Sequence, residues 1–167
     1  MRYYPAAIAL SLICAVSASV GNGATVAPPD AAVELREQGR VALAAGETQA
    51  AIDAFEAALA IDPAYTTLYL DLAQAARNEG LRGKAIHYYR EMLSRDPNNF
   101  AAISGEGEAM VEIGAMEKAR RNLAQLQSLC GDSCEETRAL AEALTKAPEE
   151  KVLTAEAVTP KATVTQN

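Results

Sequence analysis

Apolar residues along the chain follow helical spacing and then repeat over a longer distance. The segment 51–63, AIDAFEAALAIDP, returns as the segment 85–97, AIHYYREMLSRDP, with an offset of 34 residues at every position. Apolar residues three and four positions apart lie on one face of an α-helix. This pattern predicts helices at about 31–45, 48–61, 65–79, 82–95, 99–113 and 116–129. No useful stretch alternates with a period of two, so the chain is predicted to be all-α.

Glycine and proline mark the expected helix ends. Gly46, Gly80 and Gly114 occur at the same phase of the period, each where a first helix should stop. Glycine readily adopts the left-handed conformation that such an end requires. Asp62-Pro63 and Asp96-Pro97 should end the second helix of a pair, because the residue before proline disfavours helical geometry.

The period and its small-residue pattern resemble the tetratricopeptide repeat (TPR) family. The first unit matches at Leu35, Gln38, Gly39, Ala42, Ala51, Phe55 and Pro63. The second unit matches at Tyr69, Leu72, Ala73, Ala76, Ala85, Tyr89 and Pro97. The third unit matches at Ile103, Glu106, Gly107, Met110, Ala119 and Leu123, without a closing proline. Gln38 and Glu106 stand where the family usually has leucine.

The resemblance implies a right-handed superhelical array of antiparallel helix pairs. Its three units are expected at 31–64, 65–98 and 99–130, followed by a capping helix within 131–146. Small residues such as Gly39, Ala73 and Gly107 should let helix axes approach closely. Large residues, Phe55 and Tyr89 among them, should then fill the space between units.

The capping helix is predicted from its own pattern. Ser133 and Glu136 have the spacing of a capping box, which predicts a helix start at Cys134. One face then carries Thr137, Leu140, Ala141 and Leu144. Repeat arrays need such a terminal element with a polar outer face.

The two ends of the chain differ from the repeats. Residues 1–23 resemble a secretory signal peptide, with Arg2, a short apolar run from Ala6 to Val16, and small residues after it. The mature chain should then begin near Ser19 or Ala24 and be periplasmic or secreted. The run is short for a bilayer, so no membrane insertion is expected after cleavage; an uncleaved anchor is the alternative. Residues 24–30 are expected to be a linker, and 147–167 a disordered tail.

Composition excludes several function classes. The formal charge is −7 and no basic patch is present, so nucleic acid binding is not expected. His87 is the only histidine and is expected on the surface. No phosphate-binding loop or nucleophile elbow occurs. The chain is therefore predicted to be non-enzymatic, with no cofactor and no metal site.

Two cysteines remain after the signal peptide, Cys130 and Cys134. An oxidising compartment favours a disulfide between them, and Gly131 can relax the helical geometry that would keep them apart. Such a bridge would attach the capping helix to the last repeat. A redox-active pair and a metal site are the alternatives.

In the TPR family, first helices line a groove that receives peptides or partner helices. Carried over by position, the groove here would include Val33, Arg36, Arg40, Leu43, Leu70, Asp71, Gln74, Arg77, Ser104, Glu108, Val111 and Glu112. Arg36 and Arg40 lie one turn apart and are expected to be exposed and to grip a carboxylate. The family's carboxylate clamp is absent, because Asp71, Ala101 and Gly105 occupy its other positions.

These observations predict a module that binds a protein or peptide partner, an adaptor or assembly factor of the cell envelope. A partner segment should be acidic where it meets Arg36 and Arg40, and basic where it meets Glu108 and Glu112. One alternative is a thiol-active protein that uses Cys130 and Cys134. Another is a structural subunit held permanently in an envelope complex.

Overall fold

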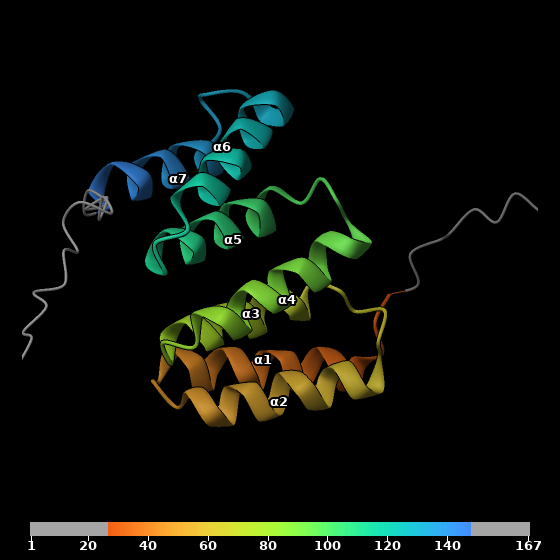
Figure 1. Cartoon of the computed structure of the whole chain (residues 1–167). Helices are drawn as coiled ribbons and strands as arrows, with labels where there is room; N and C mark the ends of the chain where they lie inside the picture. Colours follow the sequence, from red (N-terminus) through yellow and green to blue (C-terminus); the bar gives the residue numbers. More distant parts are fainter. Residues whose placement is uncertain (1–26, 148–167) are drawn as a thin grey trace, which may run out of the picture.

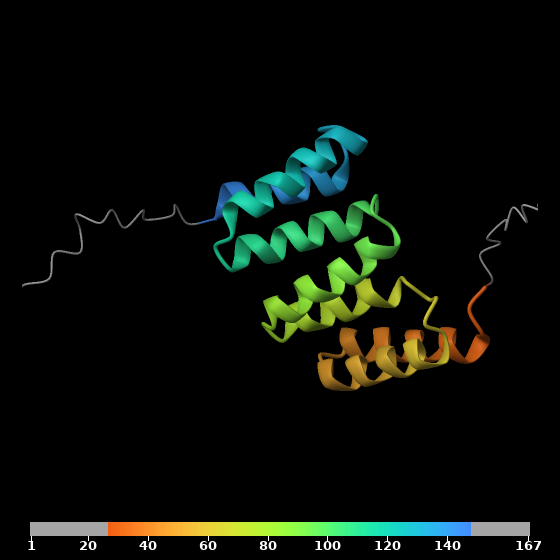
Figure 2. The same ribbon diagram turned by 45° about the vertical axis from the view of Figure 1, so that its right-hand side comes forward.

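The computed structural model describes residues 27–147, which form seven helices and no strand. They are α1 (Asp30–Ala44), α2 (Thr48–Ile61), α3 (Leu68–Asn78), α4 (Arg82–Arg95), α5 (Phe100–Glu112), α6 (Met116–Cys130) and α7 (Glu135–Lys146). The helices stack in chain order, from α1 and α2 at one end to α6 and α7 at the other (Figures 1 and 2). None of the helices within 27–147 is long and apolar enough to cross a membrane. The expected signal peptide and most of the expected tail lie outside the described residues.

The three glycine turns adopt the predicted conformation. Gly46, Gly80 and Gly114 have φ values of +80°, +73° and +77°. The residue after each glycine donates its amide to a carbonyl in the last turn of the preceding helix. For example, the Glu47 amide donates to the Ala42 carbonyl at 2.9 Å. This is the hydrogen-bond pattern that glycine commonly completes at helix ends. The same turn therefore joins α1 to α2, α3 to α4 and α5 to α6.

Four helices start one to three residues away from the predicted positions: α1 at Asp30, α3 at Leu68, α5 at Phe100 and α7 at Glu135. α3 begins at Leu68, not at residue 65, because Asp62 holds the intervening residues in a turn: its carboxylate accepts from the Ala64 amide at 2.9 Å. Pro29, in extended geometry, is the N-cap of α1. Cys134, not Ser133, is the N-cap of α7, and no side chain caps that helix, so the capping-box prediction is wrong.

Close helix packing occurs where the small residues were predicted. A Cβ atom at Gly39 would overlap the ring of Phe55, which is fully buried. A Cβ atom at Gly107 would overlap Leu140, the fully buried residue by which α7 packs on α5. α7 thus covers the end of the array, as the capping prediction required.

The two polar residues at leucine positions have opposite environments. Gln38 is exposed, since no described residue packs over that side of α1. Glu106 is only 7% exposed, and its carboxylate accepts from Arg90 Nε at 2.7 Å and from Asn122 Nδ2 at 3.0 Å. A buried carboxylate costs little when it is paired in this way. Glu106 therefore joins α4, α5 and α6 through polar contacts in place of apolar packing.

We expect Gly39→Ala to destabilise the protein by about 1–3 kcal/mol, because the new methyl group overpacks against Phe55. The control is Gly83→Ala in α4, where a Cβ atom meets nothing within 4 Å. That change should stabilise by about 0.5–1 kcal/mol through helix propensity. Urea unfolding followed by circular dichroism measures both. Equal stabilisation by the two substitutions would contradict the packing described here.

Candidate functional site

The odd-numbered helices form the inner row of the stack. The backbones of α1 and α3, of α3 and α5, and of α5 and α7 approach each other closely, whereas no two even-numbered helices within residues 27–147 do so. α2 and α4 meet through long side chains, as in the hydrogen bond that the Tyr88 hydroxyl donates to Glu56 at 3.2 Å. The axes are closest on the odd-numbered side, so we call the surface of α1, α3, α5 and α7 the inner face. All twelve predicted groove residues are on its helices: Val33, Arg36, Arg40, Leu43, Leu70, Asp71, Gln74, Arg77, Ser104, Glu108, Val111 and Glu112.

Between α1 and α3 on the inner face, Arg36 is paired within the protein. Its Nε donates to Asp71 on α3 at 2.5 Å, and its Nη1 donates to the Tyr65 hydroxyl at 3.2 Å. The hydrogen bond to Asp71 raises the pKa of Arg36. The Arg36 side chain is 26% exposed, against 57% for Arg40. The expectation that both arginines are exposed for one partner carboxylate is therefore wrong for Arg36.

Between α3 and α5 on the inner face, Arg77 joins the two helices. Its Nη1 donates to Glu108 at 3.0 Å and its Nη2 donates to Glu112 at 2.6 Å. Arg82 Nε donates to the second oxygen of Glu112 at 3.0 Å. Burial alone would raise the pKa of Glu112, but these two arginines outweigh it and lower the pKa. Burial opposes the charge of Arg77 too, yet its hydrogen bonds to Glu112 and the nearby Tyr89 and Glu108 raise the pKa of Arg77.

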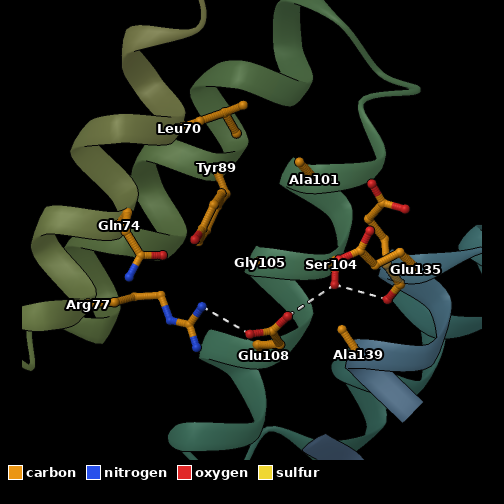
Figure 3. A pocket seen from close by; sticks show the side chains of 11 residues that line it. Leu70, Gln74, Arg77, Tyr89, Ala101, Ser104, Gly105, Glu108, Glu135 and Ala139 are labelled. Carbon is orange, nitrogen blue, oxygen red and sulfur yellow. Dashed lines mark hydrogen bonds and ion pairs between the residues drawn. The ribbon is translucent and has the colours of Figure 1, made fainter. Parts of the chain in front are cut away.

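Next to Arg77 lies a cavity of about 430 Å³, which we call the central cavity. Figure 3 shows its two walls: Leu70, Gln74 and Arg77 on one side, and Glu135 and Ala139 on the other. Small residues of α5 lie between the walls, and the Tyr89 ring lies between Gln74 and Gly105. The complete lining is Leu70, Gln74, Arg77, Tyr89, Ala101, Ser104, Gly105, Glu108, Glu135, Glu136 and Ala139.

Tyr89 reaches this cavity because α5 carries glycine opposite it. A Cβ atom at Gly105 would overlap the end of the Tyr89 ring. Ser104 Oγ lies within 3.1 Å of both Glu108 Oε1 and the Glu136 carbonyl, so it connects α5 to the start of α7. The cavity is therefore held by packing and hydrogen bonds from α3, α4, α5 and α7.

The wall from α7 is not among the predicted site residues, because the sequence pattern of this helix predicted only a cap. A signal was present. Thr137, Leu140, Ala141 and Leu144 follow Ile103, Glu106, Gly107 and Met110 at the same 34-residue offset. Extending the period one step further places Glu135 after Ala101, and Ala139 after Gly105. α7 thus has the position of a first helix of a further unit.

Two more hollows flank the central cavity on the inner face. One, of about 320 Å³, is lined by Arg40, Leu43, Ala44, Asp71 and Gln74. The other, of about 440 Å³, includes Val111, Glu112, Met116 and Ala143 and shares Arg77 and Glu108 with the central cavity. The predicted residues other than Val33 and Arg36 therefore line one of these three hollows.

Cys130 ends α6 and Cys134 precedes α7, with Gly131 between them at a φ of +84°. The structure places their sulfur atoms at bonding distance, with Cα atoms 5.8 Å apart, which lies within the range of natural disulfides. Closing so short a loop stabilises by about 2 kcal/mol on the chain-entropy account. The bridge would attach the wall helix α7 to the last repeat.

No histidine lines the central cavity. His87 is exposed on α4, as predicted, and stands apart from the central cavity. Within residues 27–147, no group of three histidine, cysteine or acidic side chains is arranged to hold a metal ion. The site instead offers a shaped surface with fixed charges.

The fold and its inner face define a helical-repeat protein. The sequence profile of the tetratricopeptide repeat family matches residues 22–66 and 36–100. The chain belongs to this family. A search of curated proteins finds no match.

Solved structures of TPR domains share the architecture. The Sgt2 TPR domain from Aspergillus fumigatus has a TM-score of 0.64 and 26% identity, over 72% of this chain and 81% of that one. The Arabidopsis OM64 TPR domain has a TM-score of 0.63 and 18% identity, over 70% and 95%. The second TPR domain of human RPAP3, solved in complex with the HSP70 peptide SGPTIEEVD, has a TM-score of 0.63 and 18% identity, over 72% and 99%.

We expect Arg77→Met to lower the free energy of unfolding by about 1 kcal/mol at pH 7, since it leaves Glu108 and Glu112 less compensated. The pKa of Glu112 is lowered from 4.5 in the folded protein. Its contribution is therefore present above pH 4.5 and is lost as the pH falls through the folded value. The difference between wild type and variant should shrink from pH 7 to pH 3.

The control for this prediction is Arg120→Met, because Arg120 pairs only with exposed Glu117 on the same helix. Its effect should be within error at both pH values. Denaturant titrations at the two pH values measure the differences. A loss of stability in Arg77→Met that grows as the pH falls would contradict the ion-pair assignment.

Proposed function

We propose that this protein is a non-enzymatic adaptor or assembly factor that binds a peptide or helix of a partner protein along its inner face. The observation that carries the proposal is the central cavity, which α3, α4, α5 and α7 build together. Its volume of about 430 Å³ is in the range of ligand-binding sites. Membership of the TPR family supports the same function, as does the peptide bound to the RPAP3 domain.

The partner segment differs from the peptide of that domain. SGPTIEEVD is acidic at its end. Here Asp71, Ala101 and Gly105 replace the polar and basic residues of the family's carboxylate clamp, and Asp71 already neutralises Arg36. An acidic tail would therefore find few free donors on this inner face, and carboxylates nearby would repel it.

We further propose that the protein works in the cell envelope, as a periplasmic or secreted protein. The support is the sequence pattern of residues 1–23, with Arg2 before the short apolar run. The cysteine pair agrees with this location, because disulfides persist in oxidising compartments.

The binding surface can be tested with a photo-crosslinking amino acid. At Ala101, which is exposed and lines the central cavity, it should capture the partner. At Gln125, exposed on the outer helix α6, it should not. The measurement is the crosslinked mass after irradiation of cells and enrichment of this chain. Capture from Gln125 but not from Ala101 would move the binding surface to the outer helices.

Export and the disulfide are tested by one intact-mass measurement on the natively isolated protein. The mass should correspond to a chain that begins near Ser19 or Ala24, and it should be lower by two hydrogen atoms than that of the reduced chain. Neither Cys130 nor Cys134 should react with iodoacetamide before reduction. Two reactive thiols would exclude the bridge and favour the thiol-active alternative, and an intact N-terminus would contradict signal cleavage.

A further inference from the structure

The central cavity has two unlike walls, and the difference indicates what it binds. We propose that it receives the side chain of a lysine or arginine presented by the bound partner segment. This inference rests on the proposed function, which makes the inner face the binding surface. It reverses the polarity of the carboxylate clamp known from the family, because the cavity here would recognise a cation.

The wall formed by α3 has no spare positive charge. Arg77 is the only basic residue of the lining, and its side chain is 19% exposed. It donates to Glu108 and Glu112, and Arg82 completes the pairing of Glu112. Two arginines thus face two carboxylates, so this group adds no net charge to the cavity.

The wall formed by α7 keeps its charge. Glu135 and Glu136 line the cavity, and neither makes an ion pair with another residue of 27–147. The N-terminus of α7 contributes roughly half a positive charge, which is less than the two carboxylates carry. The cavity as a whole is therefore negative on the α7 side.

The rest of the lining suits the stem of a long cationic side chain. Leu70 stands on one wall and Ala139 on the other, and Ala101 and Gly105 leave the floor open between them (Figure 3). Lysine and arginine bury their methylene groups along such apolar surface and keep the charged head at a polar edge. Glu108 can help to hold that head, because its oxygens each accept one bond and a carboxylate has about four acceptor positions.

An acidic or neutral side chain fits less well. A carboxylate would meet Glu135 and Glu136 with no free cation beside it, which costs binding energy. An apolar side chain would offer these carboxylates no hydrogen bond, and Glu136 Oε2 would keep only its contact with Cys134 Sγ at 2.9 Å. A lysine or arginine instead forms charge-assisted hydrogen bonds with them, which are stronger than neutral ones.

The test begins with selection from a random dodecapeptide library on the full chain. Selected peptides that crosslink through Ala101 should share a lysine or arginine. In the strongest of them, exchange of that residue for norleucine, which keeps the apolar stem, should weaken binding at least about tenfold. When the protein carries Glu135→Gln and Glu136→Gln, the norleucine exchange in the peptide should weaken binding little further. Such coupling in a double-mutant cycle places the cation against these two carboxylates.

The matched control is Glu34→Gln/Glu37→Gln, which removes the same charge from exposed positions of α1 outside the central cavity. It should bind the peptide as wild type does. Circular dichroism of both double variants should show unchanged helix content, because these glutamates support no other described helix through ion pairs.

The remaining outcomes separate this inference from the proposed function. Peptides that crosslink through Ala101 but bind equally well with norleucine overturn the cation site and leave the inner face as a binding surface. A library that yields no peptide crosslinked at Ala101 overturns both. If binding appears only after Lys151→Gln/Lys161→Gln, the site belongs to the chain's own C-terminal segment and the assignment to a partner is wrong.

Discussion

The close approach of helices at glycine positions is the contact on which the rest of the structure depends. The Phe55 ring packs against the backbone of α1 at Gly39, and Leu140 packs against α5 at Gly107. Tyr89 packs against α5 at Gly105 in the same way, next to the central cavity. Because the end of its ring lies over Gly105, Tyr89 lines the central cavity, while most of its surface contributes to the core.

A second constraint acts along the inner face. Arg36 with Asp71, and Arg77 with Glu112, join residues that are one repeat and one position apart, so both pairs connect successive inner helices. Partly exposed pairs of this kind contribute about 1 kcal/mol or less each. Their larger effect is on recognition, since they use the charges that a partner would otherwise meet. What remains available is set by the residues outside these pairs, chiefly Arg40 at one end and Glu135 with Glu136 at the other.

The fold was predictable because its determinants are local and periodic. Gly46, Gly80 and Gly114 indicate three turns of one kind, and the structure confirms them. The charge pairing of the inner face was not predictable in the same way. Whether Arg36 reaches Asp71 depends on the offset between α1 and α3, which the packing of whole repeats determines. The sequence therefore identified the charged residues that α1, α3 and α5 place on this surface, but not which of them neutralise one another.

Glu106 shows the same limit in the core. At a leucine position the sequence indicates only a weak match, yet the structure buries this residue with Arg90 and Asn122 as partners. Those partners come from the preceding and following helices, and no motif relates them to Glu106. A polar residue inside a repeat can therefore be a satisfied part of the core, and an ill-fitting consensus position does not by itself indicate a weak repeat.

The arrangement of α7 separates stability from recognition. Its apolar side, with Leu140, caps the array and carries the packing energy. Its first turn carries Glu135 and Glu136, which suit the positive end of a helix and which no described residue requires as ion-pair partners. Arg77 differs, because its removal would disturb both the ion pairs between α3 and α5 and the lining of the central cavity. Specificity at the α7 wall can thus change by substitution of two exposed or half-buried glutamates, while the contacts that hold the array together stay in place.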